Sequence, residues 1–216
     1  MSYIITNIEN VFKLLLEHIE MTGLAVLIAV AIALPLSWLI TYYRWLNVPV
    51  LGFLGTLYTI PSLALMILLV PIFGLNRQSV IVAMIIYTQI ILVRNFSVAL
   101  QSIEPAILEA AKGMGMNVWQ RWWWVQLPLI LPICLAGVRL ATIIAIAIAT
   151  IGAKFGAGGL GVLLFDGVSQ SRYDKIWAGA IGVAVLAFAL NGMLFGLQVL
   201  SNSKWKIRQF IHTNTT

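Results

Sequence analysis

The chain has 216 residues, of which 61% are hydrophobic and only 9% are charged, and its formal net charge is +6. A soluble domain carries about a quarter charged residues, so 13 Lys and Arg with 7 Asp and Glu are too few to cover a water-exposed surface. This composition excludes an ordinary soluble globule and a disordered tail, and the scattered basic residues exclude a nucleic-acid-binding domain. It predicts an all-α membrane protein that crosses the membrane several times.

The N-terminal segment, residues 1–20, combines apolar and charged side chains at helical spacing. Glutamates occur throughout it and no basic segment precedes an apolar core, so no cleavable signal peptide is expected. We predict an amphipathic helix at the membrane interface or against the first span. Its apolar positions are Ile4, Ile5, Ile8, Val11, Phe12, Leu15 and Ile19.

Five segments are apolar enough to cross a membrane, which takes about 20 helical residues. They are residues 21–43, 50–73, 79–100, 129–151 and 176–200, which with the loop 101–128 form one membrane domain, 21–200, followed by a tail, 201–216. Pro35, Pro61 and Pro71 lie within these spans and free backbone groups that must find partners there. The single Cys134 permits no internal disulfide.

The distribution of Lys and Arg predicts the orientation of the chain. With the N-terminus outside and the C-terminus inside, the cytoplasm receives a basic set that includes a cluster after the last span. This set is Arg44, Lys112, Arg121, Lys204, Lys206 and Arg208. On the opposite side the basic residues are diluted by acids, which are Glu9, Glu17, Glu20, Asp166 and Asp174.

The loop between the third and fourth spans contains no acid–base pair and no nucleophile beside a base. Glu104 and Pro105 suit the first turn of a short helix, and strong helix formers continue it to Ala111. Gly113 and Gly115 are expected to end or bend this helix. The sequence therefore predicts a short helix that protrudes into the cytoplasm and docks a partner.

This loop resembles the coupling loop of ABC importer permeases, which reads Glu-Ala-Ala, three residues, Gly, nine residues, Ile, one residue, Leu-Pro. The chain matches every spacing and departs only at Val125, which stands in the Ile position. In that family the short helix fits a cleft on the ATP-binding subunit. The resemblance thus implies a set of coupling residues, which are Glu109, Ala110, Ala111, Gly113, Gly115, Leu127 and Pro128.

Further segments resemble the osmoprotectant branch of this family, whose members transport glycine betaine, carnitine or choline. They are residues 58–65, 71–75, 92–95, 109–116 and 156–161. Methionine permeases are similar in length, in their five-span layout and in the glycine-rich loop. A permease for methionine or another amino acid therefore stands as the alternative.

The resemblance implies a transport subunit of a prokaryotic inner membrane that is not itself an enzyme. The chain has no GxxxxGK[ST] motif, so no bound cofactor is expected and ATP and Mg belong to a partner. The implied partners are two ATP-binding subunits, a second permease copy or homologue, and a substrate-binding protein, with no nucleic acid. No metal site is expected either, because the two histidines and one cysteine lie far apart. An ATP-independent enzyme or scaffold is disfavoured, since no acid lies in the middle of a span.

Several residues in or beside the spans are candidates for a gate or transport pathway. A charge in the membrane centre costs about 2.5–3.5 kcal/mol on insertion scales, so Arg139 is expected to face protein or water. Residues 156–161 match GxGxxG, but a dinucleotide site needs a preceding strand, so an external loop or a tight turn is expected. The candidates are Pro61, Ser62, Arg94, Asn95, Arg139, Gly158 and Gly159.

The orientation can be tested with single cysteines and a membrane-impermeant thiol reagent in intact cells. Cysteines at Asn47 and Asn202 should be protected, and a cysteine at Ser169 should react, because the basic loops are retained inside. Labelling at Asn202 together with protection at Ser169 would reverse the assignment.

Overall fold

The computed structural model describes residues 2–213, and it describes the side chains of residues 3–202. The described chain is helical, as predicted, and contains no strand. In chain order its helices are α1 (Ser2–Thr6), α2 (Ile8–Tyr42), η1 (Arg44–Leu46), α3 (Asn47–Thr59), α4 (Ser62–Phe73), α5 (Arg77–Gln101), α6 (Pro105–Gly113), α7 (Val118–Arg121), η2 (Trp122–Gln126), α8 (Leu127–Gly152), η3 (Ala153–Phe155), α9 (Gly161–Ser169) and α10 (Tyr173–Thr213).

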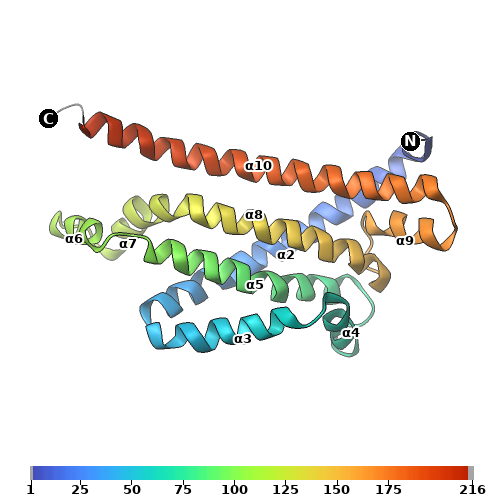
Figure 1. The fold of residues 1–216 in the computed structure, drawn as a ribbon, viewed down its shortest axis with the longest axis horizontal. Helices are drawn as coiled ribbons and strands as arrows, with labels where there is room; N and C mark the ends of the chain where they lie inside the picture. Colours follow the sequence, from blue (N-terminus) through green and yellow to red (C-terminus); the bar gives the residue numbers. More distant parts are fainter. Residues whose placement is uncertain (1, 214–216) are drawn as a thin grey trace.

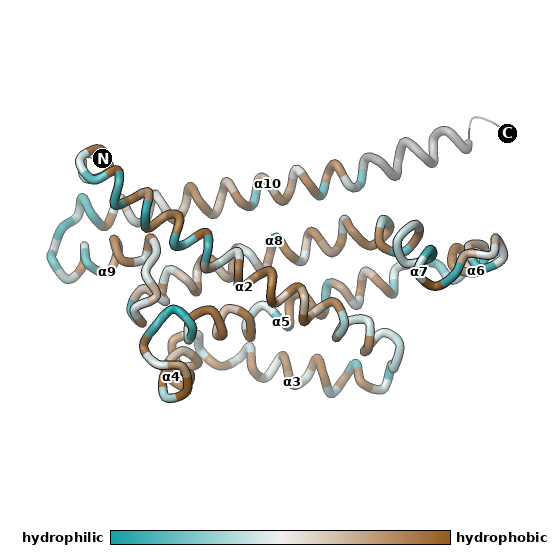
Figure 2. The backbone as a smooth tube through the Cα atoms, turned by 180° about the vertical axis from the view of Figure 1, so that it is seen from behind, coloured by the Kyte–Doolittle hydropathy of each residue, from teal (hydrophilic) through white to brown (hydrophobic). Residues whose placement is uncertain are grey.

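The helices form an elongated bundle in which α2 and α8 both pack against α5. Helix α10 lies along α8 and α9 on one side, and α3 and α4 lie along α5 on the other (Figure 1). Hydrophilic segments gather at the two ends of the bundle, whereas the long helices between them are mainly hydrophobic (Figure 2). This distribution is the one that a bundle embedded in hydrocarbon requires.

Four helical segments of the described chain are long and apolar enough to cross a membrane. They are Ile8–Tyr42, Arg77–Gln101, Val118–Phe155 and Tyr173–Asn202. A bent pair of helices provides a fifth if it is counted as one span. The last of these segments continues into the predicted tail, 201–216. The side chains of Lys204, Lys206 and Arg208 lie outside the described residues.

The structure differs from the prediction at the N-terminus, where the amphipathic segment and the first span share one helix. Helix α2 runs without a break from Ile8 to Tyr42 and contains Pro35. At 1.5 Å per residue, its 35 residues extend about 52 Å, which is longer than the hydrocarbon core. No proline occurs between residues 8 and 34, so nothing in that stretch interrupts the backbone hydrogen bonds.

The predicted second span, residues 50–73, also differs, because it forms two helices that meet at an angle of 96°. The break lies at Ile60 and Pro61, whose ψ values of 125° and 136° are extended. A proline disfavours the helical conformation of the preceding residue and supplies no N–H of its own. Neither α3, with 13 residues, nor α4, with 12, could cross the membrane alone.

Small residues allow the central helices to approach closely. A Cβ on Gly137 of α8 would lie 2.7 Å from the Cβ of Asn95 in α5, and one on Gly152 would collide with Cγ1 of Val80. Ala83, Ala145 and other small side chains are fully buried in the same region. Such residues are typical of helix–helix contacts within membranes, where the helices associate through close packing.

The contact between α5 and α8 predicts that Gly137→Ala destabilises the fold. Because the added methyl group collides with the Cβ of Asn95 rather than with a flexible side-chain end, we expect a loss of about 1–3 kcal/mol. The measurement is the thermal unfolding midpoint of the purified protein.

The matched control is Gly192→Ala in α10, where no heavy atom lies within 4 Å of the added Cβ. This variant should leave the unfolding midpoint unchanged or raise it. Adding Asn95→Gly to Gly137→Ala should restore part of the lost unfolding midpoint, because it removes the Cβ with which the new methyl group collides. Equal midpoints for the two alanine variants would contradict the close approach.

Candidate functional site

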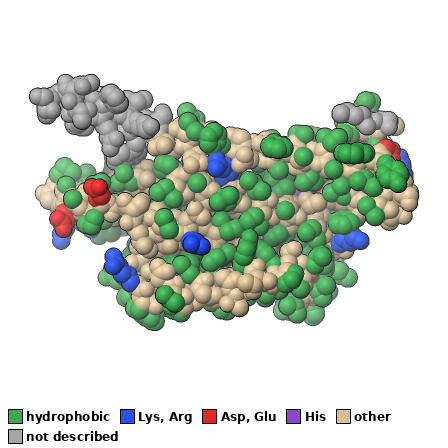
Figure 3. All heavy atoms as spheres, viewed as in Figure 1, with side chains coloured by type: hydrophobic (Ala, Val, Ile, Leu, Met, Phe, Trp, Pro, Cys, Tyr) green, Lys and Arg blue, Asp and Glu red, His purple; other side chains and the backbone are tan. Residues whose placement is uncertain are grey.

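The segment between α5 and α8 lies at one end of the bundle (Figure 1), where both acidic and basic side chains are seen on the surface (Figure 3). Together with the start of α8 it contains the predicted coupling residues. Helix α6 has Pro105 in its first turn, where a missing N–H interrupts no helical bond. Glu109 and Ala110 are exposed, whereas Ala111 is only 2% exposed. One side of α6 is therefore anchored and the other is accessible to a partner.

The end of α6 is a glycine turn that the sequence predicted. The N–H of Gly115 donates to the carbonyl oxygen of Lys112 at 3.0 Å, and the N–H of Met116 donates to that of Ala111 at 3.2 Å. Gly115 has a φ of +80°, a conformation that favours glycine. A Cβ there would meet no heavy atom within 4 Å, so the constraint on this position comes from the backbone alone.

A capped turn and a π-helical turn connect this glycine to α8. The side chains of Asn117 and Gln120 form a reciprocal capping box at the start of α7. Residues Trp122–Gln126 then form a π-helical turn that leads directly into α8. Pro128 explains the wider turn, because it supplies no N–H and its ring crowds the carbonyl group four residues earlier. The sequence analysis did not anticipate this turn, although a proline just after an aromatic run was its signal.

The candidate gate residues do not gather in one site. Pro61 and Ser62 lie at the break between α3 and α4, near the tilted pair of rings of Tyr58 and Tyr87, whose centroids are 5.5 Å apart. The side chain of Asn95 donates from Nδ2 to the carbonyl oxygen of Ile91 at 2.8 Å, so its hydrogen bond is made within α5. The structure therefore places these residues on separate elements.

The two arginines within the membrane helices differ in their surroundings. The side chain of Arg94 on α5 is exposed. The guanidinium carbon of Arg139, midway along α8, lies 5.2 Å from the ring centroid of Phe195 on α10. This distance is that of a cation–π contact. The contact gives the guanidinium group a partner on the neighbouring helix.

Gly158 and Gly159 lie in a loop at the opposite end of the bundle from α6, and this loop packs against α2. The N–H of Gly159 donates to Oε2 of Glu17 at 3.1 Å. Both glycines have a φ of +78°, and a Cβ on Gly159 would lie 2.9 Å from Nδ1 of the buried His18. The sequence analysis missed this role of residues 17 and 18, which lie more than a hundred positions away along the chain.

The same loop also touches the connection between α4 and α5. A Cβ on Gly156 would lie 3.3 Å from the carbonyl oxygen of Leu75. The loop follows a helix, since η3 precedes it, and it leads into α9. A dinucleotide fingerprint follows a strand, so the GxGxxG spacing here is a packing turn.

Charged side chains pair beside this loop, at the start of α10. Nζ of Lys175 lies 3.0 Å from Asp166, and the Arg172 guanidinium lies 2.8 Å from Asp174. Both cations also contact the ring of Tyr3, at 5.4 and 6.0 Å from its centroid. In the part of the chain that the structure describes, no three metal-ligating side chains gather.

Comparisons with known proteins agree with this geometry. Residues 20–207 match the family model described as "Binding-protein-dependent transport system inner membrane component". The osmoprotectant import permease protein OsmW of Salmonella typhimurium is 39% identical over 207 residues, which are 94% of this chain and 96% of that protein. The glycine betaine/carnitine/choline transport system permease protein OpuCB of Bacillus subtilis is 33% identical over 178 residues, 82% of each chain.

Solved structures with the same fold include a chain of the MetNI methionine ABC transporter in an inward-facing conformation. It aligns with a TM-score of 0.73 at 19% identity, over 86% of this chain and 93% of that one. A chain of an amino acid ABC transporter with histidines aligns with a TM-score of 0.69 at 17% identity. At these identities the likeness establishes the arrangement of the helices.

Proposed function

This chain belongs to the family of binding-protein-dependent transport system inner membrane components, and we propose that it is the permease subunit of an ABC importer for osmoprotectants. The observation that carries the substrate class is the similarity to OsmW, which extends over nearly the whole of both chains. Permeases named for glycine betaine, carnitine or choline are also 32–37% identical to this chain. Glycine betaine, carnitine and choline are the proposed substrates.

We propose that α6 is the coupling helix that receives the ATP-binding subunit. Its exposed face carries Glu109 and Ala110, a combination of a hydrogen-bond acceptor and a small side chain that suits close approach in a cleft. Gly115 sets the direction of α6, and α7 and η2 link it to Leu127 and Pro128 at the start of α8. Movement of the ATP-binding subunit would thereby reach the membrane helices.

The proposed complex contains further subunits. ATP and Mg bind to two copies of an ATP-binding subunit, and a second permease copy or homologue completes the pathway. A substrate-binding protein delivers the solute to the end of the bundle that contains the glycine loop. Transport proceeds by alternating access, in which the two permeases rock against each other as the ATP-binding subunits close.

We propose that the gate and pathway use elements where the helices are interrupted or polar. These are the break at Pro61 and Ser62, the polar positions Arg94 and Asn95, Arg139, and the loop at Gly158 and Gly159. The break supports a gate because a 96° bend exposes backbone groups that water or substrate can satisfy. The glycine loop supports one because it joins three segments of the bundle at one end.

The proposed orientation places the N-terminus outside and the C-terminus inside. Arg44, Lys112 and Arg121 then lie on the same side as α6, which must be cytoplasmic to meet an ATP-binding subunit. Glu17, Asp166 and Asp174 lie on the opposite side, with the glycine loop. A bundle with its basic excess on the cytoplasmic side follows the usual rule for membrane insertion.

A permease for methionine or another amino acid is the second candidate, favoured by the fold of the MetNI chain. Uptake into proteoliposomes that contain the whole importer separates the two. Radiolabelled glycine betaine, choline and carnitine should enter with ATP, and methionine should not compete. Uptake of methionine that glycine betaine fails to inhibit would favour the second candidate.

The proposal assigns ATP hydrolysis to the ATP-binding subunit, and this assignment gives a direct prediction. The purified chain alone should hydrolyse no ATP, because it carries no phosphate-binding motif. Co-expression with its ATP-binding subunit should yield a complex with substrate-stimulated ATPase activity. ATP turnover by the isolated chain, persisting after repeated purification, would contradict the proposal.

The coupling helix predicts that Gly115→Val uncouples ATP hydrolysis from transport. Because φ at this position is +80°, a β-branched residue should strain the turn by about 1–3 kcal/mol and redirect α6. Glu109→Lys should weaken docking through its reversed charge. Membrane abundance, co-purification of the ATP-binding subunit and substrate-stimulated ATPase in proteoliposomes are the measurements.

Two conservative variants serve as controls. Gly115→Asn should retain more coupling than Gly115→Val, because asparagine tolerates the left-handed conformation. Glu109→Gln keeps a hydrogen-bond acceptor and should retain more docking than Glu109→Lys. Normal uptake and normal stimulation in both Gly115→Val and Glu109→Lys would show that this segment is not the coupling element.

A further inference from the structure

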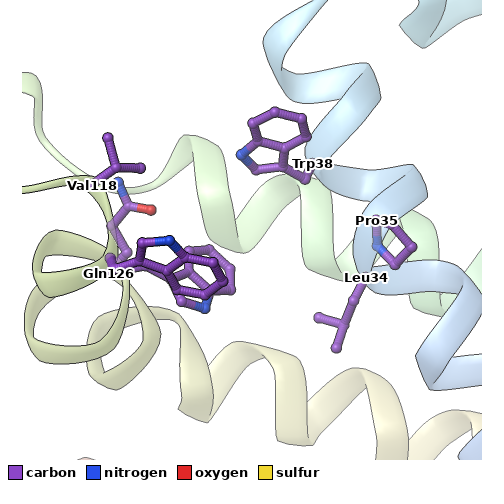
Figure 4. Close-up of a pocket in the computed structure, with 7 residues that line it drawn as sticks. Leu34, Pro35, Trp38, Val118 and Gln126 are labelled. Carbon is purple, nitrogen blue, oxygen red and sulfur yellow. The ribbon is translucent and has the colours of Figure 1, made fainter.

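A groove with a volume of about 410 Å³ lies between α2 and the turn that leads into α8 (Figure 4). We call it the tryptophan groove, and its walls include Leu34, Pro35 and Trp38 of α2 together with Trp119, Trp122 and Gln126. Gln126 is the polar member of this set, and no charged side chain lines the groove. The close-up shows Trp38 on one side and the α7–η2 segment on the other.

The tryptophan groove opens away from the centre of the bundle. On α2, Ala33, Ser37 and Ile40 are fully buried against the neighbouring helices, whereas Leu34 and Trp38 are exposed. Trp38 is 53% exposed and Trp119 is 72% exposed, so their rings are walls of an open groove rather than parts of the core. Trp122 packs partly against the core and forms the floor. The outer surface of a membrane bundle at this position faces lipid or a neighbouring chain.

An aromatic row continues from the groove toward the end of α2. The rings of Trp38 and Tyr42 stack with their centroids 5.6 Å apart, and Tyr42 and Tyr43 meet edge to face at 4.7 Å. Tryptophan and tyrosine concentrate where acyl chains give way to headgroups, because their rings are apolar and their N–H or O–H groups are polar. The groove therefore lies at the depth where an acyl chain begins.

The two chain segments that form the walls of the groove carry only basic charges close to it in sequence. Arg121 is the last residue of α7 and directly precedes Trp122 of η2, and Arg44 directly follows the aromatic pair of Tyr42 and Tyr43. Residues 21–46 and 118–126 contain no acid. A quaternary ammonium solute is a poor occupant here, because the guanidinium groups of both wall segments repel it and neither segment contains a carboxylate. An anionic headgroup, in contrast, is attracted by basic residues next to a membrane helix.

We propose that the tryptophan groove binds one anionic phospholipid. Its acyl chain lies between Trp38 and Trp119, and its phosphate lies near Arg121 and Arg44. The lipid then fills the space between α2 and the segment that joins α6 to α8. Binding of this lipid steadies the α7–η2 connection against the first membrane helix.

The test uses the purified, delipidated full-length chain and measures lipid binding by native mass spectrometry. The probes are dioleoyl phosphatidylglycerol, which is anionic, and dioleoyl phosphatidylcholine, which is zwitterionic. The combined variant Trp38→Ala/Trp119→Ala should weaken phosphatidylglycerol binding about tenfold or more, because both apolar walls are lost. The unfolding midpoint of each variant verifies that the fold is retained.

Trp45→Ala/Trp124→Ala is the matched control, because both rings are 74% exposed and neither lines the groove. It should leave phosphatidylglycerol binding within about twofold of the unmodified chain. Arg121→Gln should reduce the preference for phosphatidylglycerol over phosphatidylcholine. Lys154→Gln, whose parent side chain lies over the Phe165 ring at the other end of the bundle, should preserve that preference.

Leu34→Cys reports on the groove itself. Phosphatidylglycerol should slow its reaction with a maleimide, and phosphatidylcholine should slow it less. Several results would overturn the proposal. They are equal lipid binding by the groove and control variants, equal binding of the two lipids, displacement of phosphatidylglycerol by glycine betaine, and Leu34→Cys protection by a second copy of the chain without lipid.

Discussion

The structure depends on one constraint, which is that hydrocarbon offers no hydrogen-bond partner to a peptide group. Long helices satisfy this constraint by pairing most of their backbone N–H and C=O groups internally, and α2, α5, α8 and α10 are the result. The helices can then pack only through their side chains. Glycine and alanine at the crossings of α5 and α8 bring the backbones close, because lipid tails supply no hydrophobic force that would favour larger side chains.

Three interruptions of the helices stand out against this constraint, and each lies in a proposed functional element. Pro61 opens α3–α4 by 96°, Pro128 widens the turn before α8, and Gly115 ends α6 with a positive φ. The glycine loop at 156–161 is stabilised by a carboxylate, since Glu17 accepts a hydrogen bond from the N–H of Gly159.

Much of this architecture could be predicted from the sequence, because the signals were local. Apolar length predicted the membrane helices, and Glu104, Pro105 and Gly115 predicted the short helix α6 and its turn. The fusion of residues 8–20 with the first span was missed, because a change in polarity does not end a helix. The 96° angle was also missed, since a proline in a sequence marks a break without giving its direction. The contact of Glu17 and His18 with the glycine loop depends on packing between distant segments, which no local pattern reveals.

The charged side chains are arranged differently at the two ends of the bundle. All seven acids lie near one end or the other, and none lies within α3, α4, α5 or α8. The end with the glycine loop is tied together by ion pairs and by Glu17, so the segments that meet there are constrained relative to one another. At the other end α6 exposes Glu109 and Ala110 but buries Ala111, and the turn at Gly115, α7 and η2 join it to α8. In the proposed coupling, movement of α6 passes through α7 and η2 to α8, which reaches the glycine loop at its far end through η3. This connection along the chain supports the proposal that an ATP-binding subunit at α6 opens and closes the opposite side of the membrane.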